Sequence, residues 1–142
     1  MDKTVKLSLY FYGLFLFSSS VFAIEIITHN DSGLSLNFKN EENIRAIFSM
    51  RQRYWSNSEK IKVFVLADNH VVHKAFAKEK LAIFPHQLRR SWNRMTYTGT
   101  GQSPKTVNSV IEMIQKVKQT PYSIGYVDTL VSDDDIKVMG AR

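Results

Sequence analysis

The chain has 142 residues, of which 19 are basic and 13 acidic, and it contains no cysteine. This length suits one ordinary domain, and the lack of cysteine excludes a disulfide framework and thiolate chemistry. A formal net charge of +6 would attract an anionic partner: nucleic acid, anionic lipid or an anionic solute.

Residues 1–23 have the pattern of a cleavable signal peptide. Lys3 and Lys6 are followed by a mostly apolar run, and Val21 and Ala23 stand at the −3 and −1 positions of a cut after Ala23. The alternative is a membrane anchor, but the run is shorter than the ~20 residues of a spanning helix. The sequence therefore predicts a periplasmic domain over 24–142. With 17 basic and 12 acidic residues, this domain has a charge of +5, and export makes nucleic acid its least expected partner.

The first half of this domain predicts two strands, each followed by a helix. Short β-branched runs at 24–28 and 61–66 predict the strands. Asn40 can cap the first helix, and the second is expected over 71–81. The residues expected on the inward sides of these helices are Ile44, Ile47, Phe48, Val72, Ala75 and Phe76.

The second half predicts two more helices and two more strands. Pro85 suits the first turn of one helix, and Ser103-Pro104 predicts the start of the next. Runs at 123–127 and 136–139 predict the strands. The expected inward residues are Leu88, Trp92 and Met95 in one helix, and Val107, Val110, Ile111, Ile114 and Val117 along the other. Because strands alternate with helices, the order predicts an α/β domain with a largely parallel sheet flanked by helices.

The motifs favour neither catalysis nor a metal site. His70 and His73 could share a helix face near Asp68, but zinc needs three or four converging ligands, so two surface histidines at a helix start are expected. The sequence has no nucleophile elbow, and the Gly99-x-Gly101 pair lacks the third glycine of a dinucleotide fingerprint. The arginines around Trp92 are expected to form a solvated basic face. We therefore expect no enzyme activity and no cofactor.

Several separated pieces between residues 44 and 128 resemble the short PstS-like proteins, which are classed with the substrate-binding proteins of phosphate ABC transporters. The pieces are IRAIFSMRQRYW, IKVFVLA, LRRSWNRMTYTGTGQSPKTV and VIEMIQKVKQTPYSIGYVD. The patterns W-x-R-x-x-[FY]-T-G-x-G-x-x-P and T-P-x-x-I-G-Y-V are the most specific parts. The resemblance implies a type II periplasmic-binding-protein fold and a receptor for phosphate or a similar small oxyanion. The chain has room for one of the two lobes of such a receptor.

One loop departs from the pattern that the resemblance implies. After the strand at 61–66, such receptors are expected to have an arginine and a Ser-Gly-Thr segment, whereas this chain continues Ala67-Asp68-Asn69-His70. Asp68 can accept a hydrogen bond from a protonated phosphate but repels a dianion. Weak anion binding is therefore expected.

The candidate ligand-binding residues follow predicted strands or precede predicted helices, where backbone N–H groups can hold an anion. They are His29, Asn30, Ser32, Asn69, His70, Thr100, Gly101, Gln102 and Ser103. Two functions are left open. One is a solute-binding-like protein with weak or lost small-anion binding, and the other is an interaction module that docks on an envelope sensor, transporter or other membrane complex.

Overall fold

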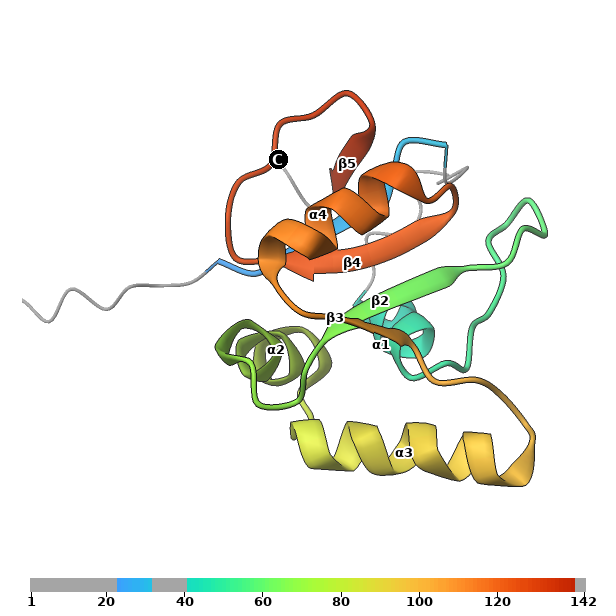
Figure 1. Ribbon diagram of the computed structural model, residues 1–142. Coiled ribbons are helices and arrows are strands. Elements are labelled where there is room, and N and C mark those ends of the chain that lie inside the picture. The colour runs from blue at the N-terminus through green and yellow to red at the C-terminus, as the bar shows by residue number, and fades with distance from the viewer. Residues whose placement is uncertain (1–22, 32–40, 140–142) are drawn as a thin grey trace, which may run out of the picture.

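The centre of the fold is a five-stranded sheet with the strand order β3-β2-β4-β1-β5 (Figure 1). The computed structural model describes residues 23–31 and 41–139. The strands are β1 (Glu25–His29), β2 (Lys62–Leu66), β3 (Lys105–Val107), β4 (Ser123–Val127) and β5 (Ile136–Met139). β2 and β4 are almost fully buried, because each has a partner strand on both sides.

Four of the five strands point in the same direction. β2 pairs in parallel with β3 and β4, whereas β1 pairs antiparallel with both β4 and β5. The predicted α/β class with a largely parallel sheet is confirmed, and β1 is the one reversed strand. Because Thr28 and Val63 both pair with Ile124, β1 ends at the side of the sheet where β2 and β4 begin.

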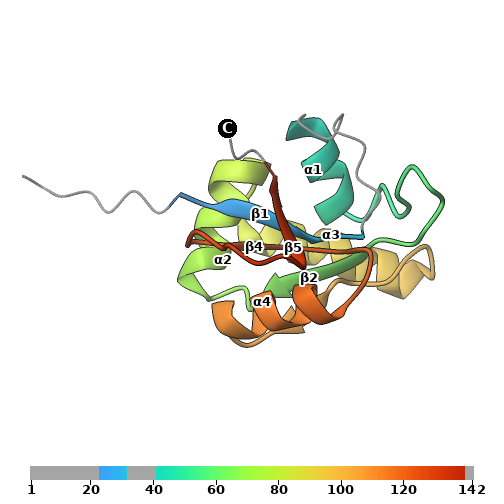
Figure 2. The same cartoon turned by 90° about the horizontal axis from the view of Figure 1, so that it is seen from above.

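Helices cover both faces of the sheet. They are α1 (Glu41–Phe48), α2 (Val71–Phe76) with its π-helical continuation η1 (Ala77–Leu81), α3 (Pro85–Thr98) and α4 (Val110–Gln119). Figure 2 shows the sheet between α1 and α4. α3 packs against α1 through Trp92, whose indole N–H donates to the Phe48 carbonyl at 2.9 Å.

The fourth helix begins at Val110 and not at the predicted Ser103-Pro104. Residues 105–107 instead form β3 and satisfy the edge of β2, which would otherwise present unpaired backbone groups. Ser109 caps α4, because its hydroxyl accepts the Glu112 N–H at 3.0 Å. The prediction was wrong because a local helix signal competed with a strand pairing that depends on distant residues.

The inward faces of the first three helices largely agree with the sequence, whereas that of α4 differs. Ala75 and Met95 are half-buried, and the other residues expected inward on those three helices are buried. On α4, Met113 and Val117 are fully buried, while Ile111 is 70% exposed. The predicted stripe began at Val107, which belongs to β3. It therefore assigned Ile111 to the buried face of the helix, where the structure has Met113.

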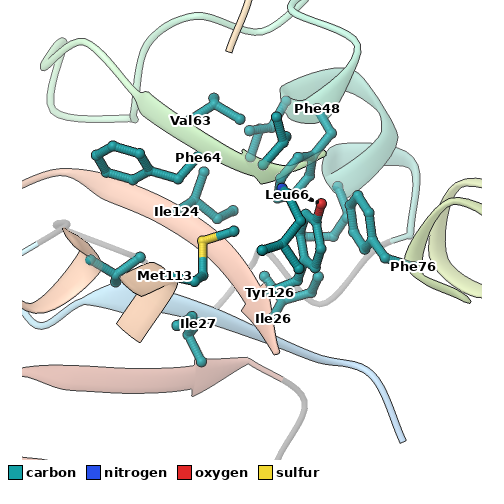
Figure 3. Packing of buried hydrophobic residues seen from close by; sticks show 14 of the residues in the cluster. Ile26, Ile27, Phe48, Val63, Phe64, Leu66, Phe76, Met113, Ile124 and Tyr126 are labelled. Carbon is teal, nitrogen blue, oxygen red and sulfur yellow. Dashed lines mark hydrogen bonds between the residues drawn. The ribbon is translucent and has the colours of Figure 1, made fainter. Parts of the chain in front are cut away.

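Aromatic rings and sulfur fill the core on the two faces of the sheet (Figure 3). Tyr126 stacks on Phe76 with ring centroids 3.8 Å apart, and Phe48 meets Phe76 edge-on at 4.7 Å. On the α4 face, Gly125 lets the helix approach β4, since a Cβ at this position would lie 2.5 Å from the Met113 sulfur. The glycine of the T-P-x-x-I-G-Y-V pattern therefore has a packing role.

Candidate functional site

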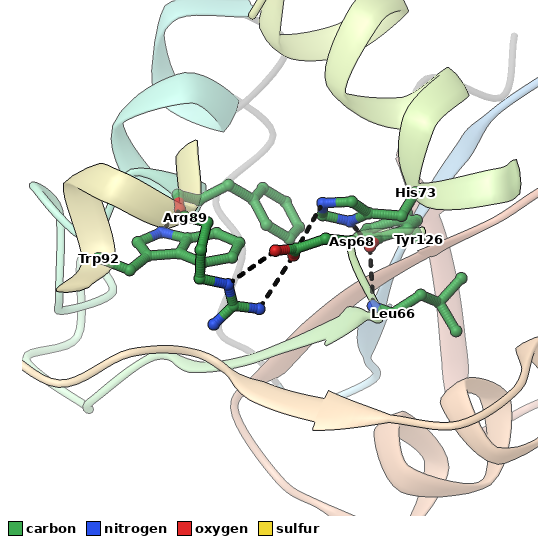
Figure 4. A network of polar contacts seen from close by, with 7 residues as sticks. Leu66, Asp68, His73, Arg89, Trp92 and Tyr126 are labelled. Atoms are coloured by element: carbon green, nitrogen blue, oxygen red, sulfur yellow. Dashed lines mark hydrogen bonds and ion pairs between the residues drawn. The ribbon is translucent and has the colours of Figure 1, made fainter. Parts of the chain in front are cut away.

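A cluster of polar side chains lies where β2 ends. Arg89 of α3 donates two hydrogen bonds to Asp68, from Nε to Oδ2 and from Nη2 to Oδ1, each 3.0 Å long (Figure 4). The guanidinium also lies 5.0 Å from the centroid of the Trp92 ring. Each side chain of the pair is about one-third exposed. The guanidinium fork of Arg89 is thus matched to an internal carboxylate in the geometry with which arginine binds oxyanions.

His73 and Tyr126 form the buried floor of this cluster. The Tyr126 hydroxyl accepts the Leu66 N–H at 2.8 Å and lies 2.5 Å from Nδ1 of His73. Burial lowers the pKa of His73 to about 4, against a smaller opposite effect of Asp68. His73 is therefore neutral at neutral pH. The ring proton is assigned to Nε2, because this nitrogen faces the Asp68 carboxylate, and Nδ1 then accepts a hydrogen bond from the Tyr126 hydroxyl.

The Nε2–H of His73 points toward Asp68 without reaching it. Nε2 lies 3.9 Å from Asp68 Oδ1 and, among the residues that the structure describes, has no hydrogen-bond partner, although it is buried. Asp68 therefore faces a guanidinium on one side and a neutral imidazole N–H on the other. The end of β2 therefore already holds an anion, the Asp68 carboxylate, which is bound to Arg89.

The predicted start of the second helix is confirmed at this place. His70 caps α2, because its Nδ1 accepts the Val72 N–H at 3.1 Å. The cap uses this nitrogen of His70 as an acceptor. Asn69 precedes it and is exposed. Both residues stay beside Asp68, as their sequence position requires.

The other predicted site residues lie at the opposite end of the sheet. His29 ends β1 and its Nδ1 accepts the Asp31 N–H at 3.0 Å, while the Asn30 N–H donates to the Asp135 carbonyl at 2.9 Å. Residues 100–103, which include Thr100, Gly101, Gln102 and Ser103, lead into β3 beside the start of β2. Ser32 lies outside the described residues.

The predicted ligand residues are therefore not brought together into one site. The length of β2, roughly 16 Å for a five-residue strand, separates Asn69 and His70 from the others. His29 was expected to share the end of a parallel sheet with Asn69, but the reversed direction of β1 places it at the other end.

Two hollows flank the sheet at these opposite ends. The first, of about 1050 Å³, adjoins Asp68 and Asn69 and is walled by Lys74, Ile83 and Phe84. The second, of about 740 Å³, lies beside the start of β2 and is lined by residues 101–107 and several basic side chains. The hollow at the end of β2, beside Asp68, is thus mainly apolar, whereas the hollow at the beginning of β2 is basic.

Within residues 23–31 and 41–139, no three His, Asp or Glu side chains come close enough together to hold a metal ion. In the same part of the chain, no helix combines the length and apolar character that crossing a membrane requires.

Sequence reasoning missed three members of the polar cluster. It placed Arg89 on a solvated basic face, whereas the side chain turns to Asp68. His73 was expected to be a surface histidine at a helix start, whereas it is fully buried, and Tyr126 had no assigned role. The signal for Tyr126 was its place in the T-P-x-x-I-G-Y-V pattern, where a hydroxyl on a fully buried strand requires a buried partner.

Comparison with known proteins places the fold. Neither a protein-family model nor a curated protein sequence matches the chain. Among solved structures, it is similar to PstS from Borrelia burgdorferi, with a TM-score of 0.56 and 22% identity over 74% of this chain and 40% of that one. It is also similar to an ABC-type phosphate transport receptor from Vibrio cholerae, with a TM-score of 0.57 and 13% identity over 83% of this chain and 46% of that one. The chain therefore has a PstS-like fold, and it spans less than half the length of either receptor.

Proposed function

We propose that this chain is a periplasmic, single-lobe protein related to phosphate receptors, with weak or lost binding of phosphate or a similar small oxyanion and no catalytic role. The PstS-like fold supports the relationship to binding proteins. The observation that carries the weak binding is the bidentate pair between Asp68 and Arg89 at the end of β2.

Asp68 competes with any oxyanion for the same donor. A phosphate that approaches Arg89 must either displace the carboxylate or lie beside it, where two negative charges repel. An oxyanion also loses its hydration on binding, and several charge-assisted hydrogen bonds in an enclosed site are needed to replace it. Asp68 and Arg89 are 37% and 32% exposed, so solvent also screens the attraction of Arg89 for an external anion. Desolvation therefore outweighs attraction at this site.

The proposed periplasmic location rests on residues 1–23 and on where the core begins. Ala23 is exposed, whereas Ile24 is only 2% exposed and belongs to the core. A peptidase cut between these two residues would therefore leave the core complete. N-terminal sequencing of the periplasmic protein tests the proposal: a first residue of Ile24 is expected, and an intact Met1 in the membrane fraction would contradict it.

A second candidate function is that of a docking module on an envelope membrane complex. The observation in its favour is the first hollow, which is lined in part by Phe84, a side chain that is 66% exposed. Large exposed apolar side chains around a hollow are typical of interaction surfaces. Crosslinking in the envelope fraction separates the candidates, because docking requires a crosslinked partner that a Phe84→Ser variant loses. A crosslinking pattern unaffected by this substitution would count against docking through this surface.

Substitution of Asp68 tests the main proposal. Asp68→Asn removes the competing charge while keeping the shape of the side chain, so phosphate affinity should rise by about tenfold, equivalent to ~1.4 kcal/mol. The matched control is Asp134→Asn, which makes the same change of charge at an exposed position before β5. Calorimetric titration with inorganic phosphate measures both. Unchanged or weaker binding in Asp68→Asn, in a variant with a native circular dichroism spectrum, would show that Asp68 does not compete with phosphate.

A further inference from the structure

The second hollow has an unusual excess of positive charge. It lies at the end of the sheet opposite Asp68, where residues 101–107 and the start of β2 meet α4, and its volume is about 740 Å³. Among the side chains that line it, the cations are Arg53, Lys60, Lys62, Lys105 and Lys116, and the acid is Glu112. This ratio of five to one contrasts with 19 to 13 in the whole chain.

The charges of these cations are not balanced within the described part of the chain. The ion pairs found there join other basic residues, Arg45, His73, Arg89 and Lys118, to carboxylates. The Glu112 carboxylate accepts the Asn108 N–H at 2.7 Å and so helps to cap α4. All five cations of the hollow are exposed. Like charges that converge on one concavity raise the local positive potential, and a bound anion relieves their repulsion.

One wall of the hollow is held in place by contacts of its own. The Arg53 guanidinium donates to the Thr100 carbonyl and, from Nε, to the Met50 carbonyl at 3.3 Å. It lies across Gly101, where a Cβ would be 3.0 Å from Nη2. The Ser103 hydroxyl is 3.1 Å from that of Thr96. The cation nearest to the glycine loop is therefore positioned by the fold and does not depend on a ligand for its place.

We infer that this hollow binds a small multivalent anion that carries several linked phosphate groups. Its volume lies within the range of small-molecule sites, about 300–1,000 Å³. The cations come from four segments, namely the loop before β2, β2 itself, β3 and α4. A ligand with charges at several places can meet them together, whereas a single phosphate can contact only some of them. The inference is independent of the proposed function at Asp68, because the two places lie at opposite ends of β2.

Calorimetry with inorganic tripolyphosphate at about 0.15 M salt tests the site on the purified full chain. The wild-type protein should bind tripolyphosphate at least about tenfold more tightly than inorganic phosphate, because more charge-assisted hydrogen bonds form per ligand. The variant Lys62→Gln/Lys105→Gln should bind tripolyphosphate about tenfold more weakly. Both lysines are exposed on adjacent strands, so their substitution should leave the fold intact.

The matched control is Lys78→Gln/Lys137→Gln, which removes the same charge at exposed positions on η1 and β5. It should change the affinity by less than about twofold. An equal loss in both double variants would overturn the site in favour of general charge attraction, and so would equal affinity for phosphate and tripolyphosphate. Binding to vesicles of anionic phosphatidylglycerol, without binding of tripolyphosphate, would assign the cations to a membrane surface instead. Asp68→Asn should leave tripolyphosphate binding unchanged, which keeps this test separate from that of the proposed function.

Discussion

The Asp68 carboxylate has two polar neighbours, the Arg89 guanidinium, whose Nε lies at 3.0 Å, and His73, whose Nε2 lies at 3.9 Å. The pair with Arg89 is about one-third exposed, so its effect on stability is screened. Its effect on binding is more direct, because the Asp68 carboxylate already engages Nε and Nη2 of the Arg89 guanidinium. Below this pair, His73 and Tyr126 anchor the loop to the core through Leu66.

The burial of His73 predicts a loss of stability as the pH falls below 6.5. The unfolded chain has the ordinary histidine pKa of 6.5, whereas the folded protein has a pKa of about 4 because burial disfavours the charged ring. The unfolded state takes up its proton first, so acid favours unfolding. The contribution of the neutral His73 side chain to the free energy of unfolding is fully present above pH 6.5 and is lost as the pH falls from 6.5 to about 4. A shift of this size corresponds to about 3 kcal/mol.

Urea unfolding of the wild type, His73→Gln and His86→Gln at about pH 7 and about pH 5 measures this effect. The wild type should lose about 2 kcal/mol more than His73→Gln between the two values. His86→Gln changes an exposed histidine on α3 and should retain the wild-type dependence. An equally steep loss in His73→Gln would mean that another group controls the acid sensitivity.

At the scale of an element, the packing of α4 against β4 determines which face of this helix is buried. Met113 is fully buried against Gly125 of β4, whereas Ile111, two positions earlier, is 70% exposed. Val110 and Ile114 pack at the margin of the core. The helix thus presents a narrower buried face than its apolar composition indicates, and an apolar residue on α4 is not by itself a core residue.

Alanine substitutions on α4 test this orientation. Met113→Ala removes a fully buried side chain and should cost about 2–5 kcal/mol of unfolding free energy. Ile111→Ala should change it by less than about 0.5 kcal/mol, the usual range for a surface position. Denaturant unfolding of the two variants provides the comparison. A larger loss for Ile111→Ala than for Met113→Ala would mean that α4 buries the face that carries Ile111 and not the face that carries Met113.

The sequence predicted most elements of this fold, but not where the fourth helix begins or which way the first strand points. The strands at 61–66 and 123–127 were visible because β-branched and aromatic residues fill buried strands. β3 was not, because Lys105 and Thr106 are exposed and only Val107 is buried. The direction of β1 depends on its pairing with β4 and β5, which no local pattern of residues records.

At the scale of the whole molecule, the two ends of β2 have different chemistry. One end has an internal carboxylate bound to its arginine beside an apolar hollow, and the other has a hollow lined by five cations and one acid. The sequence predicted candidate residues that lie at both ends of β2, but it did not predict that the length of this strand separates them. Asn69 follows β2 and residues 101–103 precede β3, so the parallel pairing of these strands places the two segments at opposite ends of the sheet.

We propose that this chain has weak or lost phosphate binding, because Asp68 competes for Arg89 and the described residues form no enclosed set of donors that would replace the hydration of the ion. Calorimetric titration of the purified wild-type protein with inorganic phosphate, at low ionic strength and at about 0.15 M salt, tests this claim most directly. The account predicts a dissociation constant in the millimolar range, about −4 kcal/mol, or no measurable binding. Any binding should weaken further as salt is added. Micromolar binding of phosphate to the monomer, unchanged by salt, would contradict the account and indicate a complete receptor site.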